Sequence, residues 1–220
     1  MRALIFANGI IKNPSRIQSN LRDGDLIIAA DGGANHCHEL NITPAVVIGD
    51  LDSISDELHN LLKDREVKFI IYPKDKDQTD LELALSFAYQ QRVNEVHFYG
   101  VLGGRLDLSL SNLLLLARDD WEPLSLVVVD EPDIAYVLRN GNTISFTGNP
   151  GDIISLIPLS EKVRGVSTEG LRWKLDGAVL SMGSTLSVSN ELLEHSGQVK
   201  IGVGTLLLVH REMVNVTRQE

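Results

Sequence analysis

The chain has 220 residues, a formal net charge of −10 and an apolar fraction of 43%. This length is enough for one large or two small domains, and this apolar content excludes an intrinsically disordered chain. The acidic balance excludes nucleic acids and anionic membranes as partners, but it leaves nucleotide substrates open, because metal ions can bridge carboxylates to phosphates.

The first part of the chain alternates between strand-like and helix-like segments. The short runs rich in β-branched and aliphatic residues are Ala3–Ala7, Leu26–Ala30, Val46–Ile48, Lys68–Ile71, Val96–Tyr99 and Leu124–Val129. The clearest helix is Thr79–Gln90, which has an apolar stripe, and in which Thr79 and Glu82 are spaced as a capping box. A second helix is predicted over Ser109–Ala117. Alternating strands and helices indicate a mostly parallel sheet flanked by helices.

The pattern changes after about Glu131, where strong helical periodicity ends. Short strands then alternate with turn signals at Asn140–Asn142, Gly148–Gly151, Asp176-Gly177 and Ser196-Gly197. Asp176-Gly177 predicts a hairpin between Trp173–Leu175 and Ala178–Leu180. We therefore predict an α/β domain over residues 1–131 and an all-β domain over residues 132–220.

The strongest chemical signal is Ile48–Ser53, in which a short apolar strand ends in a glycine and is followed by Asp50 and Asp52. In an extended segment this spacing places both carboxylates on one side. In a parallel sheet the segment after a strand lies at the carboxyl edge, where ligands bind, and two close carboxylates suit Mg²⁺. The alternative is that both aspartates only cap a helix that begins near Ser55.

Three further loops follow predicted strands. Lys74–Asp80 is rich in acidic and basic residues and ends with Asp80 in the first turn of a predicted helix. Ala30–Ala34 and Gly100–Asp107 contain paired glycines, which permit close approach of a ligand to the backbone, and Arg105 is a candidate phosphate contact. Each loop alone is typical of an ordinary turn, but four such loops after four strands indicate one ligand site.

Several other chemistries have no support in the sequence. There is no P-loop, no glycine-rich dinucleotide fingerprint after a strand and no nucleophile elbow. The single cysteine, Cys37, excludes an intrachain disulfide and favours a reducing compartment. The apolar run Ala3–Ala7 is too short for a signal-peptide core, and no apolar stretch reaches the length of a membrane span. We expect a cytoplasmic protein.

The four loops, in this order, resemble those of the thiamine pyrophosphokinase family. The matching segments are Ala30–Asn35, Ile48–Ser53, Lys76–Ala84, Gly103–Asp107, Gly170–Leu175 and Ser187–Glu191. The resemblance implies a C-terminal β-sandwich and a homodimer with active sites shared between subunits. It also implies transfer of pyrophosphate from ATP to the hydroxyl of thiamine, with Mg²⁺ as cofactor and AMP as the second product.

The resemblance also assigns residues. It implies that the catalytic and Mg²⁺-binding residues are Asp50, Asp52 and Asp80. The nucleotide-binding positions that it implies are Asp31, Gly32, Gly33, Asp77, Gln78, Thr79, Gly104, Arg105 and Asp107. The positions implied for thiamine are Trp173, Ser187, Ser189 and Asn190. One departure is Leu108, which stands where the family commonly has histidine.

Two alternatives to this function stay open. The first is a pyrophosphokinase for another alcohol, such as a hydroxymethyl-pterin, because the acidic loops would serve either acceptor. The second is a non-catalytic module that senses thiamine or a nucleotide, which an incomplete acidic set would favour. Asp31, Asp50, Asp52 and Asp80 are all present, and this favours the enzyme.

Overall fold

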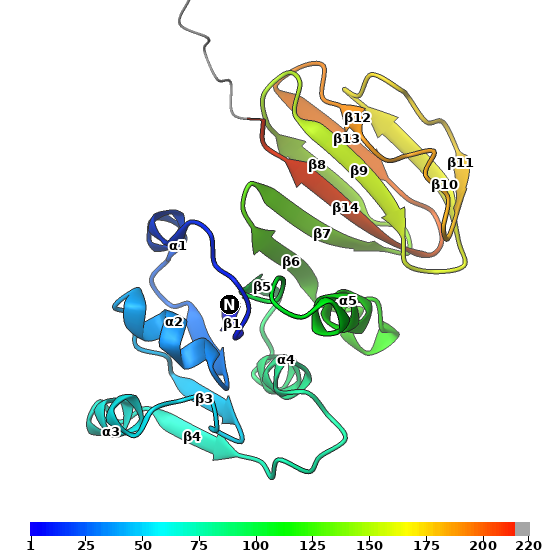
Figure 1. The fold of residues 1–220 in the computed structure, drawn as a ribbon. Helices are drawn as coiled ribbons and strands as arrows, with labels where there is room; N and C mark the ends of the chain where they lie inside the picture. Colours follow the sequence, from blue (N-terminus) through cyan, green and yellow to red (C-terminus); the bar gives the residue numbers. More distant parts are fainter. Residues whose placement is uncertain (214–220) are drawn as a thin grey trace, which may run out of the picture. The chain divides into compact units, whose positions relative to one another are not determined.

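The computed structural model describes residues 1–213, and the chain divides into two compact units, Met1–Asp130 and Glu131–Glu220 (Figure 1). Residues 214–220, which belong to the predicted all-β domain, lie outside the described residues.

The first unit is a parallel sheet whose strands pair in the order β6-β5-β1-β2-β3-β4. Its elements are β1 (Arg2–Phe6), α1 (Pro14–Asn20), β2 (Leu26–Ala30), α2 (Gly33–Glu39), β3 (Val46–Gly49), α3 (Asp56–Asp64), β4 (Lys68–Ile71), α4 (Asp80–Gln90), β5 (Glu95–Tyr99), α5 (Leu106–Leu115), the 3₁₀-helix η1 (Asp119–Trp121) and β6 (Ser125–Asp130). All six strands that the sequence predicts are present.

Helices cover both faces of this sheet, with α1, α2 and α3 on one face and α4 and α5 on the other (Figure 1). Side chains alternate along a strand, so Leu4 and Phe6 of β1 point to the first face and join a core with Cys37 of α2 and Leu62 of α3. Helix α4 packs against β1, β2 and β3 on the opposite face. The predicted parallel sheet flanked by helices is confirmed.

The helix boundaries follow from local capping. Helix α4 begins where predicted, because the backbone N–H of Glu82 donates to Thr79 Oγ1 at 3.2 Å. Helix α5 begins at Leu106, three residues earlier than predicted. Its N-cap residue, Arg105, makes no side-chain capping hydrogen bond, so the sequence carries no capping signal at this boundary. Among residues 1–213 no helix has both the length and the apolar character needed to cross a membrane.

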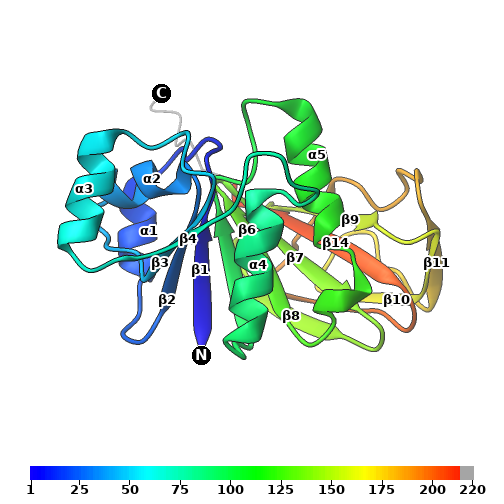
Figure 2. The same cartoon turned by 90° about the horizontal axis from the view of Figure 1, so that it is seen from below.

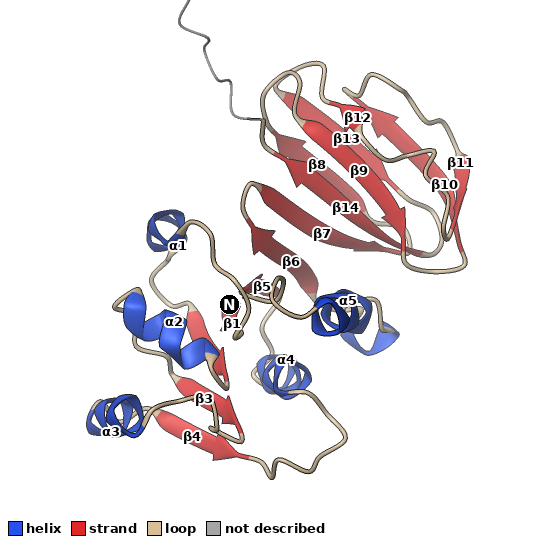
Figure 3. Cartoon of the chain, viewed as in Figure 1, coloured by secondary structure: helices blue, strands red, loops and turns tan. Residues whose placement is uncertain are grey.

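The second unit consists of two antiparallel sheets, with orders β12-β9-β14-β7 and β11-β10-β13-β8. Its strands are β7 (Asp133–Arg139), β8 (Thr143–Thr147), β9 (Ile153–Pro158), β10 (Lys162–Glu169), β11 (Ala178–Ser181), β12 (Asn190–Glu191), β13 (Ser196–Lys200) and β14 (Thr205–Arg211). Figure 3 shows only strands and loops in its described part. Ile154 and Leu208 of one sheet share a core with Val163 and Val199 of the other, which confirms the sandwich.

The predicted hairpin at Asp176-Gly177 is wrong. Strand β11 pairs with β10, and Trp173–Leu175 is a loop. Side chains of β10 hold this loop, because Thr168 Oγ1 accepts from the N–H of Leu175 at 2.9 Å and Ser167 Oγ accepts from that of Gly177 at 3.0 Å. These bonds replace the strand pairing that the turn signal suggested.

A buried hydrogen bond between His210 and Asp152 fixes the end of β14. His210 Nε2 lies 2.8 Å from Asp152 Oδ2, and both side chains are almost fully buried. Burial alone would raise the pKa of Asp152, but bonds from the backbone N–H groups of Asn149 and Met213 and from His210 lower it below its ordinary value. The ionised carboxylate therefore stabilises this unit.

Candidate active site

The strand order of the first unit creates a crevice at one edge of the sheet. Strand β1 lies between β2 and β5. Strands β2, β3 and β4 follow it on one side of the sheet, and β5 and β6 follow it on the other, so the strand order reverses beside β1, which makes this position a topological switch point. Figure 2 shows β1 running from the N-terminus toward the edge where the connecting loops lie. Ligands of open α/β sheets bind at the carboxyl ends of the strands beside such a switch point.

A cavity of about 510 Å³ lies at this switch point. Residues that follow β1, β2, β3 and β5, together with the starts of α4 and α5, line it. They include Asn8, Gly9, Asp31, Ser53, Thr79, Asp80, Gly103, Gly104, Arg105, Leu108 and Asn112. Its size suits a small molecule rather than a polymer.

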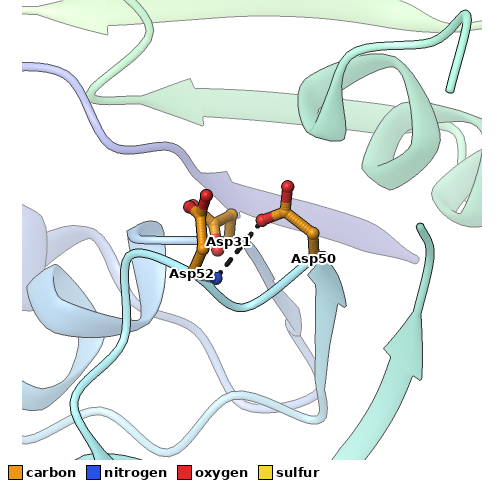
Figure 4. Close-up of side chains that lie close together, drawn as sticks. All are labelled: Asp31, Asp50 and Asp52. Atoms are coloured by element: carbon orange, nitrogen blue, oxygen red, sulfur yellow. Dashed lines mark hydrogen bonds between the residues drawn. The ribbon is translucent and has the colours of Figure 1, made fainter. Parts of the chain in front are cut away.

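Four aspartates gather beside this cavity. Asp31 follows β2, Asp50 and Asp52 follow β3, and one carboxylate oxygen of each lies within 4.8 Å of the others (Figure 4). Asp80 is the first residue of α4, and Gly49 lies between its side chain and that of Asp31. A Cβ atom on Gly49 would lie 2.9 Å from Asp31 Cβ and 3.1 Å from Asp80 Oδ1, so only glycine permits this approach.

The backbone that carries these carboxylates is bent. Asp31 and Leu51 have φ angles of 45° and 66°, which L-residues rarely adopt. The segment from Asp50 to Asp52 is therefore a turn, closed by the N–H of Asp52 donating to Asp50 Oδ1 at 3.3 Å. The two carboxylates do lie together, but the extended spacing from which we predicted this is wrong. Strained residues of this kind concentrate at functional sites.

Two lysines of the loop before α4 contact the cluster. Lys74 Nζ lies 2.5 Å from Asp52 Oδ2, and hydrogen bonding to it lowers the pKa of Asp52. Lys76 Nζ lies 3.1 Å from Asp80 Oδ1 and 3.9 Å from Asp50 Oδ2. The pKa of Asp80 is nevertheless raised, chiefly by burial and further by the charges of Asp31 and Asp50, against the opposing effect of Lys76.

The cluster has the chemistry of a divalent-cation site. Asp31 is buried, and its Oδ1 has no hydrogen-bond partner among residues 1–213. A buried carboxylate oxygen without a donor is costly unless a cation satisfies it. Hard carboxylate oxygens are the ligands that Mg²⁺ prefers. The residues present therefore fit a magnesium ion.

The structure separates the predicted nucleotide-binding residues into two groups. Asp31, Thr79, Gly104 and Arg105 line the cavity. The other five do not line the cavity. Gly32 packs against Asn8, and Gly33 packs against the backbone carbonyl of Phe6. Gln78 is hydrogen-bonded to Glu82, Asp107 is paired with Arg105, and Asp77 is exposed.

Sequence reasoning also missed residues of the cavity. Asn8 and Gly9 follow β1, which is a strand end like the others, so the same rule applied to Ala3–Ala7 would have found them. Asn112 lies inside α5, where its Nδ2 donates to the carbonyl of Val101 at 2.8 Å. No sequence motif marks this residue as part of a site.

A second cavity, of about 410 Å³, lies within the second unit. All four residues predicted to hold thiamine line it, namely Trp173, Ser187, Ser189 and Asn190, together with Lys174, Leu175, Leu186 and Val188. Trp173 is 55% exposed and Leu186 is 75% exposed, so the lining presents apolar surface to solvent.

Asn190 holds Trp173 in place at this cavity. Its Oδ1 accepts from the N–H of Trp173 at 3.0 Å, and its Nδ2 donates to the carbonyl of the same residue at 2.7 Å. Ser187 is buried, and its hydroxyl donates to the carbonyl of Leu156 at 2.7 Å. Ser189 has a φ of 61° and bonds through its N–H to Ser155 Oγ. These polar groups build the wall of the cavity.

Comparison with known proteins finds a family match in each of the two units. Residues 17–127 match the model of the thiamin pyrophosphokinase catalytic domain, and residues 141–208 match that of the thiamin pyrophosphokinase vitamin B1 binding domain. The chain belongs to the thiamin pyrophosphokinase family. The first match covers the acidic cluster, and the second covers the cavity beside Trp173. The predicted family is thus confirmed, and with it an enzyme of ATP-dependent pyrophosphate transfer to thiamine.

Individual members of the family agree with this assignment. Thiamine pyrophosphokinase from Bacillus subtilis is 28% identical over 184 residues, which cover 84% of this chain and 86% of that protein. The crystal structure of the Bacillus subtilis enzyme has a TM-score of 0.86 at 25% identity and covers 97% of this chain and 100% of that one. The Candida albicans enzyme has a TM-score of 0.76 at 16% identity, covering 96% and 90% of the two chains, which shows a shared fold.

Proposed function

We propose that the acidic cluster and the cavity at the β1/β5 switch point form the centre at which this chain transfers pyrophosphate from ATP to the hydroxyl of thiamine. The products are thiamine diphosphate and AMP. The observation that carries the proposal is the convergence of Asp31, Asp50, Asp52 and Asp80 on the edge of one cavity. Transfer of this kind depends on positioning and charge neutralisation rather than on a covalent intermediate.

The carboxylates would hold the cofactor Mg²⁺. Asp50 and Asp52 come from one turn, and Asp31 and Asp80 approach from β2 and α4. Bound Mg²⁺ would neutralise charge on the phosphate oxygens of ATP. The compact hydrogen-bonded turn at Leu51 and the absence of a side chain at Gly49 fix the carboxylates before any ligand arrives, which limits the entropy lost on binding.

The glycine-rich loop after β5 would receive the phosphates. Gly103 and Gly104 have φ angles of 85° and 72°, and Gly104 has open space where a Cβ would stand. Backbone N–H groups in such loops bind anions. Arg105 lines the same cavity and is exposed, so its guanidinium can exchange Asp107 for a phosphate oxygen.

The cavity of the second unit would bind thiamine. The thiazolium ring is a cation, and an exposed indole attracts cations through its π face. The guanidinium carbon of Arg172 lies 5.2 Å from the centroid of the Trp173 ring, and this cation–π contact supports the proposal that the indole attracts a cationic ligand. Asn190 is a positioning residue, because it fixes the backbone of Trp173.

We also propose a homodimer with active sites shared between subunits. No residue of α5 is buried, and Leu106, Leu110 and Leu114 are 84%, 56% and 49% exposed. Apolar patches of this kind mark interfaces. The test mixes Asp50→Asn with Trp173→Asp subunits, each inactive alone. Recovery of about a quarter of wild-type activity after re-association would support shared sites, because about half of the dimers are then mixed and one of the two sites in each mixed dimer is intact. No recovery in a mixed dimer would contradict it.

The proposed compartment is the cytoplasm. Cys37 is a buried free thiol, and burial raises its pKa to about 12. With a single cysteine the chain can form no intrachain disulfide, and this is typical of a reducing compartment.

Chromatography of products tests the proposed function. Wild-type protein with Mg²⁺ and ATP should yield AMP and thiamine diphosphate in equal amounts when thiamine is the acceptor. Asp50→Asn should remain folded and lose turnover, because it removes one carboxylate from the cluster. Turnover with a hydroxymethyl-pterin and none with thiamine would move the function to the alternative acceptor, and tight binding without turnover would indicate a sensor.

A further inference from the structure

Lys76 contacts two of the four aspartates of the acidic cluster, Asp50 and Asp80. Its Nζ lies 3.1 Å from Asp80 Oδ1 and 3.9 Å from Asp50 Oδ2, and only 13% of its side chain is exposed. Asp50 and Asp80 come from different elements, so this ammonium links the turn after β3 to the start of α4. None of the functions assigned above uses Lys76.

Lys74 provides a contrast on the same loop. Its side chain is 81% exposed and contacts the outer face of the cluster through Asp52, which is itself 48% exposed. Exposed ion pairs contribute little, because water screens the charges and the long side chain loses entropy. Lys76 is shielded from water, so its positive charge acts more strongly on Asp50 and Asp80.

The position of Lys76 conflicts with a divalent cation at the same carboxylates. Asp50 and Asp80 are within 4 Å of the ammonium and are also members of the proposed magnesium site. Two cations that share these oxygens repel each other at short range in a partly buried site. Lysine has a flexible four-carbon stem, so its ammonium can leave one anion for another without any backbone movement.

We propose that Lys76 is a resident counter-cation, which neutralises Asp50 and Asp80 before the metal binds and then moves to the phosphates of the nucleotide. The inference rests on the proposed function, because it takes the acidic cluster as the metal site. The ammonium makes a charge contact rather than a fixed bidentate pair, which favours its release. Binding of metal alone is then weakened by competition, whereas binding of metal and nucleotide together is strengthened.

The test compares Lys76→Met with wild type by two measurements that need no turnover. The first is Mn²⁺ affinity without nucleotide, by electron paramagnetic resonance. The second is the affinity for α,β-methylene-ATP at saturating Mn²⁺, by calorimetry. We expect Lys76→Met to bind Mn²⁺ about tenfold more tightly and the nucleotide analogue about tenfold more weakly, because one close charge is lost in each state.

Two further variants act as controls. Lys63→Met removes an exposed lysine of α3 and should leave both affinities at the wild-type value. Lys76→Arg keeps the charge and should restore most of the nucleotide affinity, which a purely structural role for the lysine stem would not require. Circular dichroism spectra of all variants check that the fold is retained.

Each other outcome overturns the inference. Unchanged Mn²⁺ affinity in Lys76→Met would show that the ammonium does not compete with the metal. Tighter Mn²⁺ binding with unchanged nucleotide affinity would show that it does not move to the phosphates. In both cases the metal site itself would stand. No binding of Mn²⁺ by wild type would remove the metal site and this inference together.

Discussion

Asp31→Asn should stabilise the protein without metal and destabilise it with metal, relative to wild type. Asp31 is buried, and a carboxylate oxygen of Asp50 lies within 4.8 Å of one of its own. Two unit charges at this distance repel by about 3.5 kcal/mol at an effective dielectric constant of 20. Lys76 offsets part of this repulsion. We therefore expect the variant to gain about 1–2 kcal/mol in the free energy of unfolding in EDTA.

Divalent metal should reverse the order of stability. A ligand at a hundredfold excess over its dissociation constant adds about 2.7 kcal/mol to the free energy of unfolding of a protein that binds it. Wild type would gain this amount with Mg²⁺ or Mn²⁺, whereas Asp31→Asn would gain much less, because it lacks the charged buried carboxylate, whose Oδ1 has no other partner among residues 1–213. The two stability curves should cross as metal concentration rises.

Thermal unfolding with and without metal measures this crossing. A change of 1 kcal/mol moves the melting temperature of a chain of this size by about 2–4 °C, which calorimetry resolves. Asp23→Asn, an exposed carboxylate of the same unit, is the matched control and should shift neither curve. A less stable Asp31→Asn protein in EDTA would refute the reasoning, since it would show that the carboxylate is satisfied without a cation.

Three other perturbations are expected to have defined effects. Gly49→Ala should destabilise the first unit by about 2–4 kcal/mol in urea unfolding and weaken Mn²⁺ binding, because its Cβ would displace Asp31 and Asp80. The pKa of Asp152 is lower in the folded than in the unfolded chain, so its contribution is present above the unfolded value and is lost as pH falls through the folded one. Acid unfolding below about pH 4 should show this loss, and Asp152→Asn should abolish it at a cost of about 3 kcal/mol at neutral pH. Trp173→Ala should raise KM for thiamine about tenfold and leave KM for ATP unchanged in steady-state assays, and equal changes in both would contradict the assignment.

The sequence predicts the sheet well because its signals are local. Runs such as Val46–Ile48 and Leu26–Ala30 are buried strands of a parallel sheet, and a parallel sheet brings the loops that follow its strands to one edge. This topological rule predicts that the loops carrying Asp31, Asp50 and Asp80 meet at one edge of the sheet.

The detail of the site depends on contacts that no periodicity encodes. The turn at Leu51 requires a positive φ, and leucine in the sequence gives no indication of one, because residues other than glycine rarely adopt it. The side chain of Lys76 lies in a loop without repeat, so its direction toward Asp50 and Asp80 could not be read from spacing. In the second unit, Asn190 bonds to a residue 17 positions away, and such pairings are decided by the tertiary fold.

The most direct test of the account follows the two outer phosphates of ATP. Wild-type protein is incubated with Mg²⁺, thiamine and ATP labelled with ³²P at the γ position, and the labelled products are separated. Pyrophosphate transfer at this site predicts that the label appears in thiamine diphosphate with an equal amount of unlabelled AMP, and that Asp50→Asn transfers no label to thiamine. Label in inorganic phosphate or in thiamine monophosphate, with ADP as the other product, would contradict pyrophosphate transfer at this site.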